Sequence, residues 1–406
     1  MKSKNQPEVN VGMVGHVDHG KTTLTQQLTG EWTDRHSEEI KRGISIKLGY
    51  ADATFYKCKS CKEPECYSIK PECSQCGGKC EETRAVSIVD SPGHETLMAT
   101  MLAGTALMNG AILLVAANEI CPQPQTIEHL MALEISNVKN IIIVQNKIDL
   151  VSDEQLMKNY EQIKNFTQGT VAEDSPVIPV CAHQEANIDT LIQAIETRIP
   201  THKFDTDLPL RMFVARSFDV NKPGTVPKSL RGGVIGGSIL HGTLSKGEDI
   251  EIAPWIKEGK AWVNLVTEAT SVISGGMERN CIKPGGLVAI GTMLDPSMTK
   301  SDGMLGKVVG KVGTLPPIWE DMTINIHPIK RVVGLASNEE IDRIKPKEPL
   351  MLNIGAATTV GIVQSFVDDV CDVKIRMPVC ASEDQRVAVS RKVKNRWHLV
   401  GWGSFK

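Results

Sequence analysis

The first half of the chain alternates between short apolar runs and segments with the apolar spacing of an amphipathic helix. The apolar runs predict strands at Val9–Val14, Ala85–Val89, Asn140–Gln145 and Val177–Val180. The helical spacing predicts helices that begin near Lys21 and cover Thr126–Ile135, Asp153–Phe166 and Ile188–Ile199. Strands that alternate with helices in this way form βαβ units, and consecutive units build a mostly parallel sheet. We therefore expect an α/β domain over residues 1–204.

Helical periodicity nearly vanishes after residue 204. The apolar runs there are short, alternate with polar residues and are interrupted by Gly and Pro, as in Leu208–Val220, Gly233–Leu240, Asp249–Ala253 and Gly286–Ile290. This pattern is typical of antiparallel β-barrels. We predict two barrels, over residues 205–320 and 321–406, with the boundary between them near Ile318–Thr323.

Composition narrows the class of protein only slightly. A length of 406 residues fits about three domains. The net charge of −3, with 23% charged residues, gives no global basic field that would mark a nucleic-acid-binding protein. Apolar runs such as Ala111–Ala117 fall far short of the roughly 20 residues that span a membrane. We expect a cytoplasmic protein of a reducing compartment without a membrane partner.

A glycine-containing segment links the first predicted strand to the first predicted helix. Residues 15–22 read Gly-His-Val-Asp-His-Gly-Lys-Thr and match G-x-x-x-x-G-K-[ST]. Between a strand and a helix this pattern is a phosphate-binding loop, whose backbone N–H groups surround the phosphates. Lys21 would then reach the outer phosphates, and the Thr22 hydroxyl would bind Mg²⁺. We expect neither His16 nor His19 to bind a metal, because the loop fixes their positions through the backbone.

Two further motifs follow predicted strands and decide which nucleotide binds. Asp90-Ser91-Pro92-Gly93 follows the second strand, so Asp90 can hold Mg²⁺ through water while the Gly93 N–H faces the γ-phosphate. Asn146-Lys147-Ile148-Asp149 follows the third strand. The Asp149 carboxylate can accept from two N–H groups that guanine offers and adenine lacks. Three such motifs in this order predict a GTPase domain.

A fourth element, usually Ser-Ala, is expected after the last strand of such a domain. The chain has Cys181-Ala182-His183 at that place. The Ala182 N–H can still meet the guanine carbonyl, while a thiol replaces the usual hydroxyl.

Six of the 11 cysteines lie between Cys58 and Cys80. The spacing Cys58-x2-Cys61, eleven residues, then Cys73-x2-Cys76 is that of a four-thiolate zinc site. A disulfide cluster is the alternative, but the chain shows no secretory signal. Either of the other two cysteines, Cys66 and Cys80, could replace one of the four ligands. Residues 57–82 are too polar to bury a core of their own, so we expect a zinc-held insert outside the sheet.

The phosphate loop and the segment Asp90-Ser91-Pro92-Gly93-His94 resemble those of the translational GTPases related to elongation factor Tu. Arg42-Gly43-Ile44-Ser45-Ile46 is similar to their first switch, with Ser45 in place of the usual Thr. The serine keeps the hydroxyl that would bind Mg²⁺. The resemblance implies that His94 is catalytic and orients the attacking water, with Val17 and Ile44 as an apolar gate beside it.

A zinc insert between the two switches resembles the gamma subunits of archaeal translation initiation factor two and their eukaryotic counterparts. Further similar stretches are Lys47-Leu48-Gly49-Tyr50, Gln123-Pro124-Gln125-Thr126, residues 216–225, residues 232–238, residues 283–287 and Gly401-Trp402-Gly403. The resemblance implies GTP-dependent binding of initiator methionyl-tRNA and its delivery to the small ribosomal subunit. It also implies alpha and beta subunits as partners in a heterotrimer, and GTP hydrolysis as the release switch.

These motifs together define the expected site. The residues expected to bind GTP or GDP are Val17, Asp18, His19, Gly20, Lys21, Thr22, Thr23, Gly93, Asn146, Lys147, Asp149, Cys181, Ala182 and His183. The residues expected to bind Mg²⁺ are Thr22, Ser45, Asp18 and Asp90.

One local feature favours an RNA partner. Residues 385–406 contain basic side chains and no acid, with Trp397 and Trp402 among them. We take Arg391, Lys392, Lys394 and Arg396 as candidate tRNA contacts, and Tyr50 as a candidate for the aminoacyl pocket. A solvated basic face on a terminal strand, and a core role for Tyr50, would give the same sequence.

Three other functions share parts of this pattern. A selenocysteine-specific elongation factor has the same GTPase domain and barrels, but we would expect it to carry a further domain after Gly401-Trp402-Gly403. The nucleotide-binding subunit of a sulfate-activating enzyme shares the loop motifs without needing the four-cysteine insert. The third is a tRNA carrier whose nucleotide is structural and is not hydrolysed. A single-turnover GTPase assay would distinguish it from a GTPase.

Overall fold

A computed structural model describes residues 5–33, 45, 47–94, 97–329, 343–393 and 396–406 of the chain. The residues fall into two units, one that ends at His202 and one that covers Lys203–Lys406. Within the described residues, no helix combines the length and the apolarity that crossing a membrane requires. The predicted domain limits near residues 204 and 320 stay predictions.

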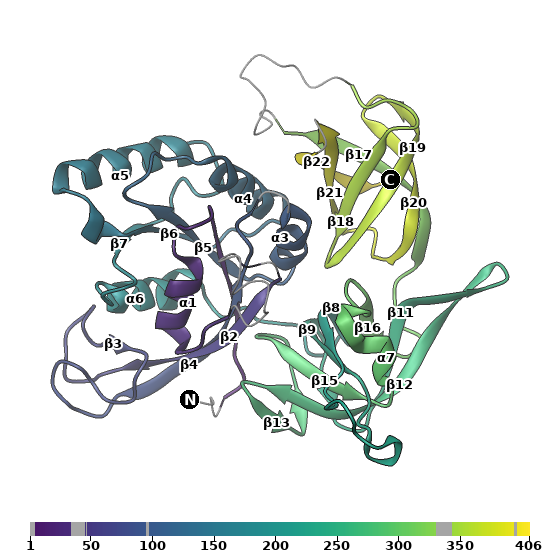
Figure 1. Cartoon of the computed structure of the whole chain (residues 1–406), viewed down its shortest axis with the longest axis horizontal. Helices are drawn as coiled ribbons and strands as arrows, with labels where there is room; N and C mark the ends of the chain where they lie inside the picture. The colour runs from purple at the N-terminus through teal and green to yellow at the C-terminus, as the bar shows by residue number, and fades with distance from the viewer. Residues whose placement is uncertain (1–4, 34–44, 46, 95–96, 330–342, 394–395) are drawn as a thin grey trace. The chain divides into compact units, whose positions relative to one another are not determined.

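The first unit alternates strands and helices, as the apolar pattern predicts (Figure 1). Its strands are β1 (Asn10–Gly15), β2 (Gly49–Lys57), β3 (Tyr67–Ser68), β4 (Glu81–Asp90), β5 (Gly110–Ala116), β6 (Ile141–Asn146) and β7 (Val177–Val180). Its helices are α1 (Lys21–Thr29), α3 (Met98–Thr105), α4 (Pro124–Ile135), α5 (Asp153–Thr167) and α6 (Ile188–Arg198), with a short 3₁₀ turn η2 (Ile148–Leu150). The apolar pattern predicts neither β2 nor α3.

The strands form one sheet in the order β3-β2-β4-β1-β5-β6-β7. Strand β1 pairs in parallel with β4 and β5, and the β5–β6 and β6–β7 pairs are also parallel. Parallel strands place their carboxyl ends at one edge of the sheet, which is where ligands bind in open α/β sheets. Strands β1, β4, β6 and β7 end at Gly15, Asp90, Asn146 and Val180, so all four predicted motifs start from this edge.

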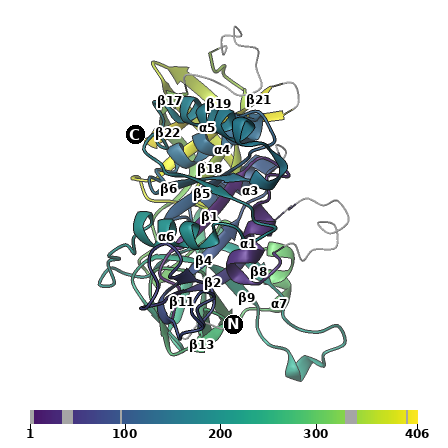
Figure 2. The ribbon, with the colours of Figure 1, turned by 90° about the vertical axis from the view of Figure 1, so that its left-hand side faces the viewer.

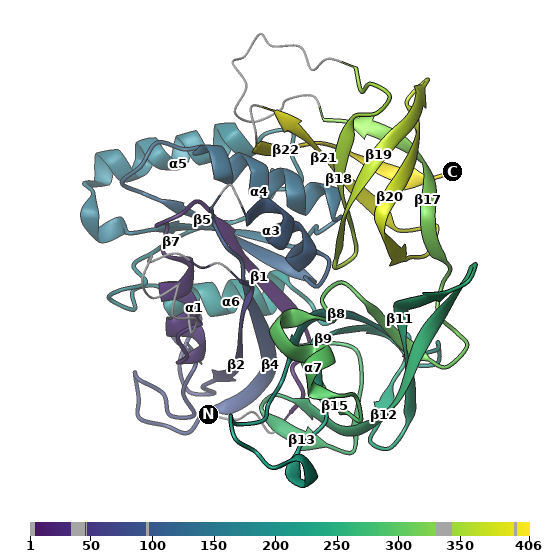
Figure 3. The ribbon, with the colours of Figure 1, turned by 45° about the vertical axis from the view of Figure 1, so that its right-hand side comes forward.

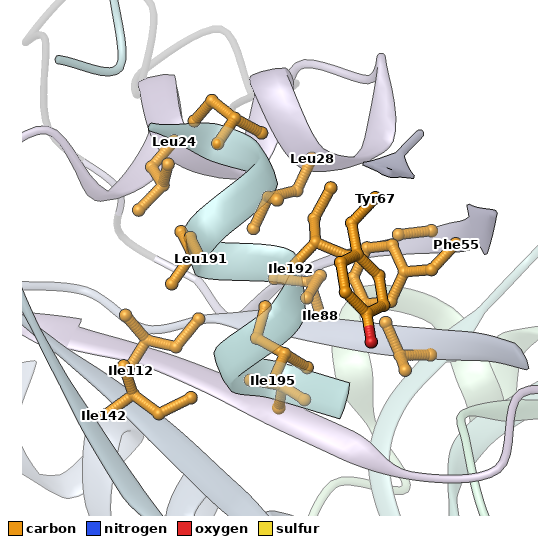
Figure 4. Packing of buried hydrophobic residues seen from close by; sticks show 14 of the residues in the cluster. Leu24, Leu28, Phe55, Tyr67, Ile88, Ile112, Ile142, Leu191, Ile192 and Ile195 are labelled. Carbon is orange, nitrogen blue, oxygen red and sulfur yellow. The ribbon is translucent and has the colours of Figure 1, made fainter. Parts of the chain in front are cut away.

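Helices cover both faces of this sheet. In Figure 2, α1 and α6 lie on one side of it, and α3, α4 and α5 lie on the other. Figure 4 shows Leu191, Ile192 and Ile195 of α6 among the buried side chains of the sheet and of α1. Burial of an aliphatic side chain contributes about 1.5–3 kcal/mol. This core therefore fixes α1, and with it the loop between β1 and α1, against the sheet.

The second unit is built almost entirely of strands. Its first part comprises β8 (Arg211–Phe218), β9 (Val234–His241), β10 (Leu244–Ser245), β11 (Asp249–Glu258), β12 (Ala261–Ser274), β13 (Met277–Arg279), β14 (Cys281–Ile282), β15 (Val288–Thr292) and β16 (Val308–Lys311). Three short helical segments accompany them: η3 (Pro227–Ser229), α7 (Pro296–Thr299) and η4 (Lys300–Asp302). Its second part comprises β17 (Ile318–Pro328), β18 (Pro349–Ile354), β19 (Ala357–Val367), β20 (Val370–Cys380), β21 (Arg386–Val393) and β22 (Arg396–Phe405).

Each part of the second unit closes into an antiparallel barrel (Figure 3). The first follows the order β11-β16-β8-β9-β15-β12, and pairing of β11 with β12 closes it. The second follows β17-β20-β19-β18-β21-β22, and pairing of β17 with β22 closes it. Each barrel surrounds its own buried aliphatic cluster. The predicted fold class, an α/β domain followed by two antiparallel barrels, is confirmed.

Candidate active site

The loop between β1 and α1 needs glycine at both of its ends. Gly15 has φ of +141° and Gly20 has φ of +93°. A Cβ on Gly15 would lie 2.5 Å from the carbonyl oxygen of Leu114, and one on Gly20 would lie 2.4 Å from Asn146 Nδ2. The loop therefore runs tightly over the sheet edge to the N-terminus of α1, where backbone N–H groups and the helix dipole favour an anion.

The Lys21 side chain forms hydrogen bonds to the backbone of this loop. Its Nζ donates to the carbonyl oxygens of Gly15 at 2.9 Å and His16 at 2.6 Å. A Cβ on Gly93 would lie 2.5 Å from that Nζ and 3.0 Å from the backbone N of Val17. Glycine at position 93 thus lets the chain after β4 approach the lysine that is expected to meet the outer phosphates.

A cavity of about 240 Å³ opens beside this contact. It is lined by Val17, Asp18, Gly20, Lys21, Thr22, Thr23, Trp32, Ser45, Gly93, His94 and Lys147. All of these except Trp32 belong to motifs that the sequence singled out. The cavity therefore gathers the phosphate loop, both expected switch segments and the expected base-recognition motif.

Two hydroxyl groups meet in this cavity at a spacing that suits a cation. The Thr22 Oγ1 and Ser45 Oγ atoms lie 3.3 Å apart. Adjacent ligands of an octahedral Mg²⁺ with bonds of about 2.1 Å lie about 3 Å apart. The two hydroxyls therefore fit one shared Mg²⁺. The rest of the predicted first switch, Arg42-Gly43-Ile44 and Ile46, lies outside the described residues.

Asn146 joins the phosphate loop to the base-recognition elements. Its Nδ2 donates to the carbonyl oxygen of His19 at 2.9 Å, and its Oδ1 accepts from the backbone N–H of Ala182 at 3.1 Å. Asp149 is exposed, and its Oδ1 accepts a hydrogen bond from Cys181 Sγ at 3.0 Å. Burial and the Asp149 carboxylate raise the pKa of the Cys181 thiol, so it stays a donor. His183 is exposed.

Protein groups contact the side chain of His19. His19 is fully buried, and its ring nitrogens contact the carbonyl oxygen of Leu114 at 3.0 Å and Glu119 Oε2 at 3.4 Å. Burial lowers the pKa of both His16 and His19. His19 could therefore meet a nucleotide only through its backbone.

Sequence reasoning missed His129, which supports the loop from α4. The Gly15 N–H donates to His129 Nδ1 at 2.8 Å, and the imidazole is buried. Burial holds the pKa of His129 well below its ordinary value, so the ring is neutral and Nδ1 is the acceptor. The signal in the sequence was a histidine on the apolar face of the helix predicted over residues 126–135.

The four predicted zinc ligands form one cluster. The Sγ atoms of Cys58, Cys61, Cys73 and Cys76 all lie within 4.8 Å of one another. The Cys58–Cys76 and Cys61–Cys73 Sγ pairs are 3.6 Å apart. Tetrahedral zinc with Zn–S bonds of about 2.3 Å requires about 3.8 Å between sulfurs. The cluster therefore fits a zinc ion.

The remaining two cysteines of the insert are not among the four whose Sγ atoms all lie within 4.8 Å of one another. Cys66 and Cys80 are buried and belong to the same apolar core as Phe55 and Tyr67. Hydrogen bonds with Cys76 and Cys73 raise the pKa of Cys61, and burial raises that of Cys80 to about 11, whereas backbone N–H groups of Cys76 and Gln75 lower that of Cys73 to about 6. A low pKa favours the thiolate, which is the form that binds zinc.

The prediction that this insert lies outside the sheet is wrong. Strand β3 pairs with β2 and is the edge strand of the sheet. Figure 4 shows Tyr67 of β3 beside Phe55 of β2. Glu63 accepts from Lys57 Nζ at 2.6 Å and from Gln193 Nε2 of α6 at 2.7 Å. Packing against α6 and pairing with β2 therefore attach the insert to the body of the unit.

Comparison with known proteins agrees with this geometry. The family model described as "Elongation factor Tu GTP binding domain" matches residues 6–201. The family model described as "Initiation factor eIF2 gamma, C terminal" matches residues 320–405.

Curated relatives match over the whole chain. Translation initiation factor 2 subunit gamma of Methanothermobacter thermautotrophicus is 56% identical over 407 residues, which cover 99% of this chain and 100% of the relative. The protein of the same name from Methanocaldococcus jannaschii is 56% identical, over 100% of this chain and 99% of the relative. The chain belongs to the gamma subunit family of translation initiation factor 2. It is therefore a translation initiation GTPase, which hydrolyses GTP to GDP and phosphate.

Two solved structures share the fold of this gamma subunit family member. A bacterial selenocysteine-specific elongation factor, EF-Sec, matches with a TM-score of 0.75 and 24% identity, over 98% of this chain and 58% of that chain. Elongation factor SelB from Methanococcus maripaludis, in complex with a GTP analogue, matches with a TM-score of 0.72 and 20% identity. That match covers 100% of this chain and 80% of SelB. At these identities the likeness shows the fold alone.

The basic residues near the end of this family member are not equivalent to one another. Arg391 is only 9% exposed, and its guanidinium donates to both oxygens of Glu348, at 2.6 and 3.0 Å. It therefore holds β21 to the segment before β18, and its role as a tRNA contact stays a prediction. Lys392 and Arg396 are exposed, whereas Lys394 lies outside the described residues. Tyr50 is partly buried at the start of β2.

Proposed function

We propose that the chain binds initiator methionyl-tRNA while GTP occupies the cavity, delivers it to the small ribosomal subunit, and releases it after hydrolysis. One observation supports this proposal above the others. Ser45 of the first expected switch and Gly93 and His94 of the second line the same cavity as Lys21. A γ-phosphate bound by Lys21 would therefore contact both switches, and its loss would release both.

The proposed roles follow from these positions. Lys21 would meet the outer phosphates, and the Gly93 N–H would face the γ-phosphate. The Thr22 and Ser45 hydroxyls would hold Mg²⁺, with Asp90 behind them through water, and the ion would neutralise charge on the phosphates. The Asp149 carboxylate would accept from guanine, and His94 would orient the attacking water.

The proposed partners are the alpha and beta subunits of the same factor. The curated relatives are named as gamma subunits of translation initiation factor 2, and such a name implies further subunits. The partner in function is initiator methionyl-tRNA, whose phosphates should make the affinity fall with rising salt. The exposed Lys392 and Arg396 are the described candidates from the basic segment.

Recognition of the methionyl group should separate this function from that of a selenocysteine-specific factor. With the alpha subunit and a GTP analogue present, we expect methionyl-tRNA to bind about 10- to 200-fold more tightly than deacylated tRNA, since one apolar group contributes about 1–3 kcal/mol. Equilibrium binding of methionyl-, selenocysteinyl- and deacylated tRNA provides the measurement. A preference for selenocysteinyl-tRNA would transfer the assignment to the elongation factor.

The chain should bind zinc in a one-to-one ratio. We expect elemental analysis to find one Zn²⁺ per chain. The double substitution Cys73→Ser and Cys76→Ser should remove it, because the two remaining thiolates cannot supply the binding free energy of about 10 kcal/mol or more that four ligands provide. Replacing the buried Cys66 by Ala is the matched control, and it should keep the zinc. Full zinc content in the double variant would instead make Cys66 and Cys80 ligands.

The double variant Cys73→Ser, Cys76→Ser should still bind GDP, although its first unit should be less stable than that of the unchanged chain. Strand β3 and Tyr67 belong to the sheet edge and its core, so loss of zinc should lower the melting temperature of the first unit. The phosphate loop, however, extends from the central strand β1. Loss of GDP binding in a variant that remains folded would show that the insert also shapes the nucleotide site.

A further inference from the structure

Thr33, which lies outside all the nucleotide-binding motifs, is hydrogen-bonded to Asp90, the aspartate expected to hold Mg²⁺. Thr33 lies beyond the end of α1, and its Oγ1 donates to Asp90 Oδ2 at 2.6 Å. Thr33 is 8% exposed and Asp90 is fully buried. Both partners are buried, and a hydrogen bond to an ionised carboxylate is about twice as strong as one between neutral groups.

The chain makes room for this threonine at Gly49. Gly49 opens β2 and is paired with Asp90, the last residue of β4. A Cβ on Gly49 would lie 2.7 Å from the Thr33 Cβ and 3.2 Å from the Asp90 Cβ. The Thr33 side chain therefore fills the space that a side chain at position 49 would occupy. This gives a physical reason for the glycine in Lys47-Leu48-Gly49-Tyr50.

The neighbour of Thr33 belongs to the nucleotide cavity. Trp32 lines that cavity together with Thr22 and Ser45, the two hydroxyls that fit Mg²⁺. Trp32 therefore lines the cavity, and the next residue, Thr33, is hydrogen-bonded to the buried Asp90 carboxylate.

We propose that Thr33 is a positioning residue that fixes the Asp90 carboxylate for Mg²⁺. The inference rests on the proposed nucleotide site. A hydrogen bond to Oδ2 restricts rotation of the carboxylate, so Oδ1 would keep one direction for a water bound to the metal. Outer partners of this kind orient the groups around a metal, and their loss costs about 10- to 100-fold in metal affinity or activity.

The release of a fluorescent GDP analogue at varied Mg²⁺ tests this proposal. In Thr33→Val, which keeps the shape and loses the hydroxyl, the Mg²⁺ concentration that half-maximally slows release should rise about 10-fold or more. Thr33→Ser restores the hydroxyl and should remain within about twofold of the unchanged chain. Thr54→Val makes the same change on β2, where Thr54 is paired with Ala85, and serves as the control.

Release in EDTA distinguishes a failure of the proposed nucleotide site from a failure of the role of Thr33. Without Mg²⁺, the unchanged chain and Thr33→Val should release the analogue at the same rate, because Thr33 acts only through the metal site. Failure of the unchanged chain to bind the analogue at all would contradict the proposed nucleotide site. Equal rates in EDTA with equal Mg²⁺ dependence would overturn the role of Thr33 alone. Tighter Mg²⁺ binding in Thr33→Val would also overturn it, since the hydroxyl would then compete with the metal.

Gly49→Ala offers an independent route to the same contact. Its Cβ should displace Thr33 and raise the Mg²⁺ requirement as Thr33→Val does. The double variant should show no further increase, because both changes remove one interaction. Additive effects of the two changes would overturn the shared mechanism.

Discussion

Changing Asp149 to Asn should lower the affinity for GTP by roughly 100- to 1000-fold and raise that for xanthosine triphosphate. A carboxylate accepts from two guanine N–H groups, and each hydrogen bond to a charged group contributes about 1.5–3 kcal/mol. An amide keeps one acceptor and turns a donor toward the other position, where xanthine has a carbonyl. Asp149 is exposed and is held by Cys181 Sγ, so the fold should tolerate the change.

Competition among GTP, ATP and xanthosine triphosphate at equilibrium measures this change in base preference. Asp153→Asn, at the exposed start of α5, removes the same charge away from the site and should leave the preference intact. The assignment of Asp149 would be wrong if the unchanged chain bound ATP and GTP equally, or if Asp149→Asn kept its preference for GTP.

Changing His94 to Ala should slow stimulated GTP hydrolysis by about 100-fold or more while leaving GTP affinity nearly unchanged. His94 lines the cavity with Val17 and Gly93, on the side where the γ-phosphate is expected. Groups that orient or activate the attacking water contribute about 10²–10⁴ in rate. They contribute little to binding, because they act on the water in the transition state.

Single-turnover hydrolysis, with and without initiator tRNA and ribosomes, measures the contribution of His94. Without partners the rate should be low, because no arginine is among the described residues that line the cavity and an arginine finger contributes about 10³–10⁵. His202→Ala, at an exposed position, is the control. Equal stimulated rates in His94→Ala and the unchanged chain would remove His94 from the mechanism. A complete lack of hydrolysis under all conditions would favour a carrier with a structural nucleotide.

The sequence predicted the parts of the fold and site that depend on local pattern. The apolar run Val9–Val14 and the loop that follows specify a buried strand, a phosphate loop and a helix, because each step depends on adjacent residues. The cysteine spacing likewise specified the four-sulfur cluster, since two tight Cys-x2-Cys turns need only approach each other. These features require little knowledge of distant contacts.

The contacts that the sequence did not predict join residues far apart in the chain. His129 supports Gly15 across 114 positions, and Thr33 holds Asp90 across 57. The pairing of Arg391 is another such contact, because its partner Glu348 lies 43 positions away, just before β18, the strand that pairs with β21. A local excess of basic residues indicates charge, and only the three-dimensional pairing shows which charges are already neutralised.

The affinity for initiator methionyl-tRNA in two nucleotide states tests the central claim most directly. With the alpha subunit present, the dissociation constant should be at least about 10-fold lower with a GTP analogue than with GDP, which corresponds to about 1.4 kcal/mol of coupling. The physical reason is that Lys21, Ser45 and Gly93 line one cavity, so a γ-phosphate orders both switches together. Equal dissociation constants in the two nucleotide states would contradict the account.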